Sequence, residues 1–173
     1  MNRTSAPALL LAALLGLSQC KKNDPAPVDQ LPPATQTGAN TFGCLLNGQP
    51  WVPYGTASFS IYYDPNYRNG TINIDTSRPI GNSSYQTITL ASDSLKTIGR
   101  YPLTIPGHQE ALFIDTKTGC RFLGSDPYYR SGFLNITRLD LQAGVIAGTF
   151  EFTLAKPGCD TIKVTQGRFD KKL

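Results

Sequence analysis

From residue 42 onward, the chain consists of short segments of alternating apolar and polar residues. Turn residues separate these segments about every 8 to 14 positions. Because successive side chains of a β-strand point to opposite faces, each alternating segment predicts a half-buried strand. In the clearest segment Ile146, Phe150, Phe152 and Leu154 share one face. No window beyond the first twenty residues shows the 3.6-residue period of a helix, so we expect an all-β protein.

Three neighbouring segments near the C-terminus predict an antiparallel meander. They lie at residues 133–140, 145–154 and 161–169. In the third segment Phe169 is out of phase with Ile162 and Val164, which predicts a β-bulge at Gln166-Gly167. Asn47-Gly48, nearer the N-terminus, is a strong signal for a β-hairpin.

With the earlier segments, this meander implies a single antiparallel domain of about eight to ten strands. The earlier segments are 42–46, 57–63, 71–75 and 86–90, with weaker ones at 98–105 and 111–115. The pattern leaves open whether the strands form a β-sandwich or a closed barrel. A hydrophobic content of 40% suffices for a core, and a charged content of only 16% excludes a coiled coil.

The N-terminus predicts an export signal over residues 1–19. Arg3 precedes an apolar run from Ala6 to Leu17, which is shorter than the roughly 20 residues that a membrane-spanning helix needs. The run from Leu17 to Cys20 then resembles a bacterial lipobox, in which the cysteine is acylated and becomes the first mature residue. Gln19 departs from that pattern, because Gly, Ala or Ser is usual there. Ordinary cleavage after Ser18 is therefore the alternative.

Residues 20–40 predict a flexible, Pro-rich tether, and residues 41–173 the all-β domain. The tether is rich in proline and poor in apolar residues, a composition that cannot form a core and suits a spacer. Without residues 1–19 the charge falls from 16 minus 12 to 15 minus 12, or +3. So mild a charge without a basic cluster excludes nucleic acid as a partner. The expected partner is a membrane, reached through the lipid on Cys20.

Three cysteines remain once Cys20 is lipidated. Cys120 and Cys159 each follow a turn, and in an oxidising compartment they are expected to form a disulfide. Cys44 lies in an apolar segment and is expected to be a buried small hydrophobe. A pairing that uses Cys44 stays open, because sequence alone does not determine connectivity.

No catalytic motif, metal-ligand spacing or phosphate-binding loop is present, so we expect no catalytic residues, no metal and no cofactor. The one histidine, His108, lies in a Pro-Gly-His turn and is expected to be an exposed loop residue. A zinc set of His108 with three cysteines lacks any C-x-x-C spacing. The 12 acidic residues leave a carboxylate pair open, and with it an alternative function as an envelope hydrolase.

Tyrosines gather at two Asp-Pro turns and form the candidate binding surface. They are Tyr62, Tyr63, Tyr67, Tyr128 and Tyr129. Exposed tyrosines offer a large contact area at low entropic cost, which suits a glycan or an envelope protein. The alternative is that these side chains close the ends of the sheets.

Both ends of the domain resemble a family of small Bacteroidota envelope lipoproteins. The segments that carry the resemblance are 31–48 with Trp51, 148–153 and 161–170. The family has no assigned function, so the resemblance implies an envelope location and an all-β fold but no catalytic residues. We expect a non-catalytic binding or structural module, lipid-anchored in the bacterial cell envelope at the outer membrane. A soluble secreted or periplasmic protein is the alternative.

Overall fold

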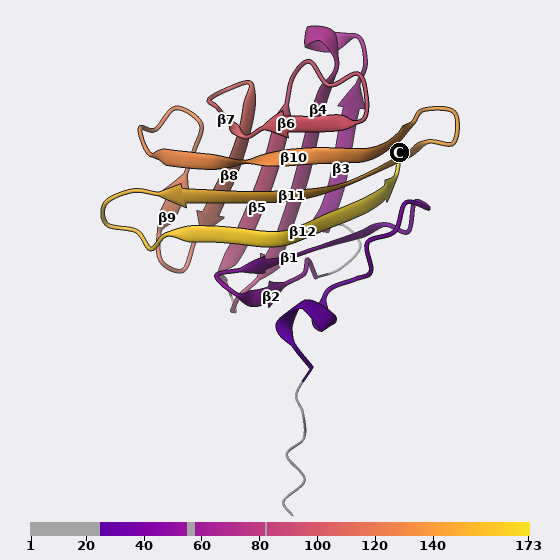
Figure 1. The fold of residues 1–173 in the computed structure, drawn as a ribbon. Helices are drawn as coiled ribbons and strands as arrows, with labels where there is room; N and C mark the ends of the chain where they lie inside the picture. The colour runs from indigo at the N-terminus through magenta and orange to yellow at the C-terminus, as the bar shows by residue number, and fades with distance from the viewer. Residues whose placement is uncertain (1–24, 55–57, 82) are drawn as a thin grey trace, which may run out of the picture.

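The protein is a β-sandwich of two antiparallel sheets (Figure 1). The structure is a computed structural model that describes residues 25–54, 58–81 and 83–173. The expected all-β architecture is confirmed, and the choice between sandwich and barrel is resolved as a sandwich. The described residues form twelve strands, more than the eight to ten expected. The additional strands are two or three residues long, too short to show an alternating pattern.

Sheet A joins the two ends of the chain. In spatial order it contains β2 (Gln49–Trp51), β1 (Thr41–Leu46), β12 (Ile162–Lys172), β11 (Val145–Ala155), β10 (Tyr129–Asp140) and β6 (Gly99–Pro102). The predicted turn at Asn47-Gly48 joins β1 to β2, and both of its residues have the positive φ that a tight hairpin needs.

Sheet B is built from the middle of the chain. In spatial order it contains β3 (Phe59–Asp64), β4 (Thr71–Pro79), β5 (Tyr85–Ser92), β8 (Gln109–Asp115) and β7 (Thr104–Ile105), and β9 (Cys120–Phe122) pairs with β8. The segment expected at 98–105 is divided between the sheets, because β6 pairs with β10 whereas β7 pairs with β8.

The C-terminal meander and its bulge are confirmed. Strands β10, β11 and β12 are consecutive neighbours in sheet A. Phe150 pairs with Gly167 and Phe152 with Val164, so Glu151 of β11 lies opposite two residues of β12. A Cβ atom at position 167 would lie 2.5 Å from the Phe150 ring, so the bulge needs glycine where β12 passes this ring.

The core lies between the sheets and consists of the inward side chains of both. Phe42 contacts three other aromatic rings, with centroid distances of 5.9 Å to Trp51, 5.4 Å to Phe59 and 5.1 Å to Phe150. Phe59 belongs to sheet B and the other rings to sheet A, so this cluster joins the sheets. The buried core cluster runs from Phe42 to Phe169. A chain of residues 25–173 therefore contains all of it.

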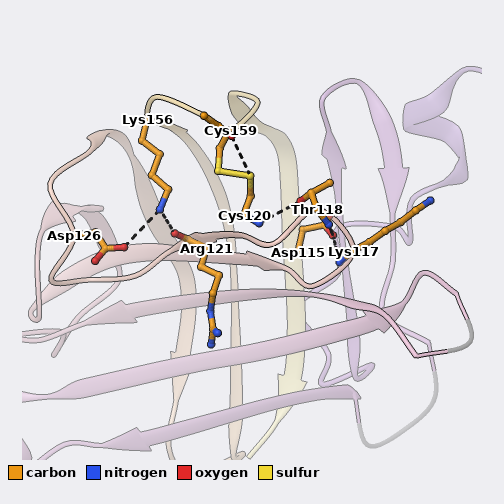
Figure 2. The surroundings of a disulfide bond; sticks show 9 residues. Asp115, Lys117, Thr118, Cys120, Arg121, Asp126, Lys156 and Cys159 are labelled. Carbon is orange, nitrogen blue, oxygen red and sulfur yellow. Dashed lines mark hydrogen bonds and ion pairs between the residues drawn. A yellow bond between two sulfur atoms is a disulfide. The ribbon is translucent and has the colours of Figure 1, made fainter.

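The expected disulfide between Cys120 and Cys159 is present (Figure 2). It links β9 of sheet B to the turn between β11 and β12 of sheet A, and beside it Lys156 reaches Asp126 and the Arg121 carbonyl. A cross-link over 39 residues is expected to stabilise the fold by about 3–4 kcal/mol. Cys44 is free and buried, as expected. Burial raises the pKa of its thiol to about 12, although Arg78 opposes the shift.

The N-terminal segment from Leu31 to Asn40 packs against the domain, where the sequence had predicted a flexible tether. It is tied to Asp170 of β12, a residue only 1% exposed. The Asp170 carboxylate accepts hydrogen bonds from Thr35 Oγ1 at 2.7 Å and from the backbone N–H groups of Gly38 at 2.7 Å and Thr37 at 2.8 Å. Burial opposes ionisation, but these hydrogen bonds outweigh it and lower the pKa of Asp170.

This segment covers part of the outer face of sheet A, where the sequence had predicted a more polar surface. Val145 and Ala147 point to that face, and both are buried. A Cβ atom at Gly38 would lie 3.4 Å from Val145, and one at Gly43 would overlap Pro32 at 2.6 Å. The 3-10 helix η1 (Pro27–Gln30) already lies beside β1 and β2, and Leu31 is the first buried residue. The domain contacts thus begin ahead of the boundary expected at residue 41.

No helix among the described residues is long and apolar enough to cross a membrane. The predicted signal peptide and Cys20 lie outside the described residues.

We predict that Phe152→Ala lowers the free energy of unfolding by about 3–5 kcal/mol, because the ring is 2% exposed and its loss leaves a cavity. Denaturant titration of residues 25–173 measures the change. Leu141→Ala is the control and should cost under about 0.5 kcal/mol, since Leu141 is 53% exposed. A cost below about 1 kcal/mol for Phe152→Ala would contradict the packing described here.

Candidate functional site

The structure separates the two groups of tyrosines that the sequence had placed on one surface. Tyr62 and Tyr63 lie on β3, the edge of sheet B, and Tyr67 lies in the 3-10 helix η3 (Tyr67–Asn69). Tyr128 packs edge-on against Phe122 of β9. Three strand spacings separate β3, which bears Tyr62 and Tyr63, from β8, which β9 flanks, so these two strands are about 14 Å apart.

The five tyrosines also differ in accessibility. Tyr62, Tyr67 and Tyr129 are 61%, 54% and 60% exposed. The Tyr63 hydroxyl donates to the Leu95 carbonyl at 2.8 Å, and the Tyr128 hydroxyl is buried. Only Tyr62, Tyr67 and Tyr129 therefore present an open ring, and the first two lie on one hairpin.

Beside Tyr67, three side chains meet around one buried carboxylate. We name Arg68, Thr71, Asp93 and His108 the Asp93 cluster. Asp93 Oδ2 lies 3.1 Å from Arg68 Nη1 and 3.0 Å from His108 Nδ1, and its Oδ1 accepts a hydrogen bond from Thr71 Oγ1 at 2.9 Å. The Asp93 side chain is 12% exposed, whereas those of Arg68 and His108 are 47% and 59% exposed.

The register of sheet B brings the cluster together. Ile72 of β4 pairs with Ser92 of β5, which in turn pairs with Gln109 of β8. Thr71, Asp93 and His108 therefore occupy the next position along β4, β5 and β8, at the adjacent ends of these strands. The Asp93 N–H donates to the His108 carbonyl at 2.9 Å, which continues the ladder by one bond.

The electrostatics of the cluster fix the charge of Asp93. Burial alone would raise the pKa of Asp93, but the hydrogen bonds from His108, Thr71 and Arg68 outweigh it and lower the pKa below its ordinary value of 3.8. Because an ionised carboxylate only accepts hydrogen bonds, His108 Nδ1 carries the proton in this contact. Asp93 thus orients the imidazole and neutralises part of the charge on Arg68.

The backbone of these loops adopts an uncommon conformation at three adjoining positions. Arg68, Asn69 and Ser94 have φ values of 46°, 63° and 60°, in the left-handed region that non-glycine residues rarely occupy. A Cβ atom at Gly70 would lie 2.3 Å from the Leu95 carbonyl oxygen, so only glycine allows this close approach. Strained backbone of this kind concentrates at functional sites.

Together these contacts present a mixed aromatic and cationic surface. The Arg68 guanidinium lies 5.3 Å from the centre of the Tyr67 ring, and His108 contacts the same Asp93 oxygen as Arg68. Guanidinium and imidazole groups bind carboxylates and phosphates, and a neighbouring phenol ring offers a face for stacking. In Figure 1 η3 lies at the end of the molecule opposite the N-terminal segment.

The other buried carboxylates hold the fold together. Asp115 accepts hydrogen bonds from Gln86 Nε2 at 2.8 Å and from the backbone N–H groups of Lys117 and Thr118. Burial opposes ionisation there too, but these bonds lower the pKa of Asp115. Glu110 pairs with Arg130 at 3.6 Å.

No group of three or more histidine, cysteine or acidic side chains that could hold a metal ion occurs in the described parts of the chain. A zinc site of His108 with three cysteines would need the thiols of Cys120 and Cys159, but these two residues are joined in the disulfide.

The sequence singled out Tyr67 as a candidate and predicted that His108 is exposed. It did not point to Asp93 or Arg68. Asp93 is 15 residues from His108 along the chain. The strand register was the signal that could have found it, since Asp93 directly follows β5 and His108 directly precedes β8. Comparison with protein-family models, curated proteins and solved structures finds no match to this chain.

We predict that Asp93→Asn makes the free energy of unfolding less dependent on pH in the acid range. A carboxylate with a lowered folded-state pKa stabilises the protein above the unfolded pKa, and this contribution is lost as the pH falls through the folded pKa. Wild type should therefore lose more stability between pH 6 and about pH 2 than the variant. At pH 7 the variant should be less stable by about 1–3 kcal/mol, because it weakens charged hydrogen bonds.

Thermal unfolding across that pH range measures the effect. Asp160→Asn removes an exposed carboxylate and should leave the pH dependence of stability as in wild type. The same acid sensitivity in Asp93→Asn and wild type would show that Asp93 is not held as described.

Proposed function

We propose that this protein is a lipid-anchored, non-catalytic binding module of the bacterial cell envelope that recognises an acidic glycan. The observation that carries the proposal is the Asp93 cluster. One buried carboxylate holds Arg68 and His108 in place, both half-exposed, beside the open ring of Tyr67. Preorganised side chains on loops at the end of a rigid sandwich are a frequent arrangement for recognition.

The exposed groups determine the class of ligand. A sugar ring stacks on an aromatic face such as Tyr67, and the free N–H groups of Arg68 suit an acidic substituent. Because Asp93 already balances part of the local charge, we expect moderate affinity that decreases as salt is added.

Three observations support an anchored envelope location at the outer membrane. The lipobox-like run ends at Cys20, the Cys120–Cys159 disulfide is typical of an oxidising compartment, and both chain ends resemble Bacteroidota envelope lipoproteins. Cys20 precedes Leu31, the first buried residue among those described, by 11 positions, which span at most about 38 Å. The end that bears η3 would then face away from the membrane.

The hydrogen-bonding of the carboxylates favours binding over hydrolysis by a carboxylate pair. Asp93, Asp115 and Asp170 each accept several hydrogen bonds, and in each of them the pKa is lowered. A general acid needs a raised pKa to hold its proton near neutral pH.

We predict that cells fed a labelled fatty acid incorporate the label into the full-length wild-type chain but not into Cys20→Ala. The thiol of Cys20 is the proposed site of acylation. Gln19→Ala is the matched variant: it supplies the residue type usual before the cysteine and should keep the label. Label in Cys20→Ala, or none in the wild type, would overturn the anchor.

We predict that residues 25–173 bind acidic glycans on an array and that Arg68→Asn and Tyr67→Ala each weaken binding by about tenfold, equivalent to about 1.4 kcal/mol. Asparagine tolerates the left-handed backbone at position 68. The array and a titration at two salt concentrations measure the effect.

Arg121→Ala and Tyr129→Ala are the matched controls, because they remove the same types of exposed side chain elsewhere on the molecule. An equal loss of affinity in these controls would show that binding does not depend on the Asp93 cluster. No binding to any glycan would overturn the proposed ligand.

A further inference from the structure

A cavity of about 610 Å³, which we name the seam cavity, lies between the two sheets beside β1, β3 and β12. It exists because β2 pairs with β1 only at Cys44–Leu46. The first half of β1 therefore has no β2 neighbour on that side. The chain leaving β2 borders the space with Val52 and Pro53, and the N-terminal segment borders it with Pro32. This volume is within the range of about 300–1,000 Å³ usual for small-molecule sites.

The lining of the cavity is mainly apolar. Phe42 of β1 and Phe59 of β3 contribute rings that are otherwise packed in the core, at 2% and 7% exposed. Val52 is 38% exposed and available to a ligand. Asn40 and Thr41 are the uncharged polar members. The core holds Phe42 and Phe59 in place, and the Asp170 hydrogen bonds hold the N-terminal segment, so these walls are preformed.

Among the described lining residues, Lys171 is the only charged one. Its Nζ lies 3.3 Å from the Phe59 carbonyl oxygen, to which it donates, and 4.9 Å from the centre of the Phe59 ring. No described acidic side chain forms an ion pair with it, across residues 25–54, 58–81 and 83–173. An ammonium has three N–H donors, and one contact leaves two for a ligand.

We propose that this cavity binds a small amphiphile with an apolar chain and a single carboxylate. The chain contacts Phe42, Val52 and Phe59, and the carboxylate accepts hydrogen bonds from Lys171 Nζ. One ammonium matches one negative charge, whereas a phosphate dianion would retain uncompensated charge in an apolar site. This site is independent of the Asp93 cluster and does not depend on glycan binding.

Decanoate and its neutral analogue decanol test the proposal by calorimetric titration of residues 25–173, the part of the chain that holds the whole core. Wild type should bind decanoate, and Lys171→Met should bind it at least tenfold more weakly. Decanol should bind both proteins equally, because the methionine keeps the apolar stem. Lys171→Arg should restore most of the decanoate affinity.

Lys172→Met is the matched control: it removes the adjacent charge, from the opposite face of the strand, and should not alter binding. Val52→Trp should fill the cavity and abolish binding of both ligands. Circular dichroism and thermal unfolding confirm that each variant is folded. The proposal is overturned if wild type fails to bind decanoate, if Lys171→Met binds it as wild type does, or if Lys172→Met causes the same loss.

Discussion

The fold depends on the contact of Phe42 with aromatic rings from both sheets. Each sheet has one apolar face, and neither face can be buried except against the other. Phe42 lies 5.1 Å from Phe150 within sheet A and 5.4 Å from Phe59 of sheet B, measured between ring centres. Trp51 closes the cluster from β2. Phe42 and Phe59 also border the seam cavity, so that part of its wall belongs to the core.

Buried carboxylates organise the loops outside that core. Asp93 joins three loops at one end of sheet B, Asp115 shapes the turn after β8, and Asp170 holds the N-terminal segment on sheet A. Each accepts hydrogen bonds that compensate for its loss of hydration. Loops that would otherwise be mobile are thereby fixed, which is what preorganised recognition requires.

The parts of the fold that follow from local pattern could be predicted from sequence. Alternation identified the inward face of β11 through Phe150 and Phe152, and a break in phase identified the bulge in β12. The covering of sheet A by Leu31–Asn40 could not be predicted, because it depends on Asp170, which is 132 residues from Gly38. A polar, proline-rich composition gives no sign that a distant carboxylate binds it.

The candidate site was only half predictable for a similar reason. Tyr67 and His108 stood out by residue type, but what unites them is the register of β4, β5 and β8. The two tyrosine groups looked equivalent in sequence because both flank Asp-Pro turns. The strand order of sheet B separates them, and strand order is a property of the whole chain.

The pairing of β1 with β12 also bears on when the protein can fold. Thr41 pairs with Asp170, so the start of β1 has no partner in β12 until residue 170 has been synthesised. Until then the N-terminal segment also lacks the carboxylate that binds it. Such long-range closure is slow compared with local folding. A chain emerging through a membrane would therefore complete sheet A only after β12 had crossed.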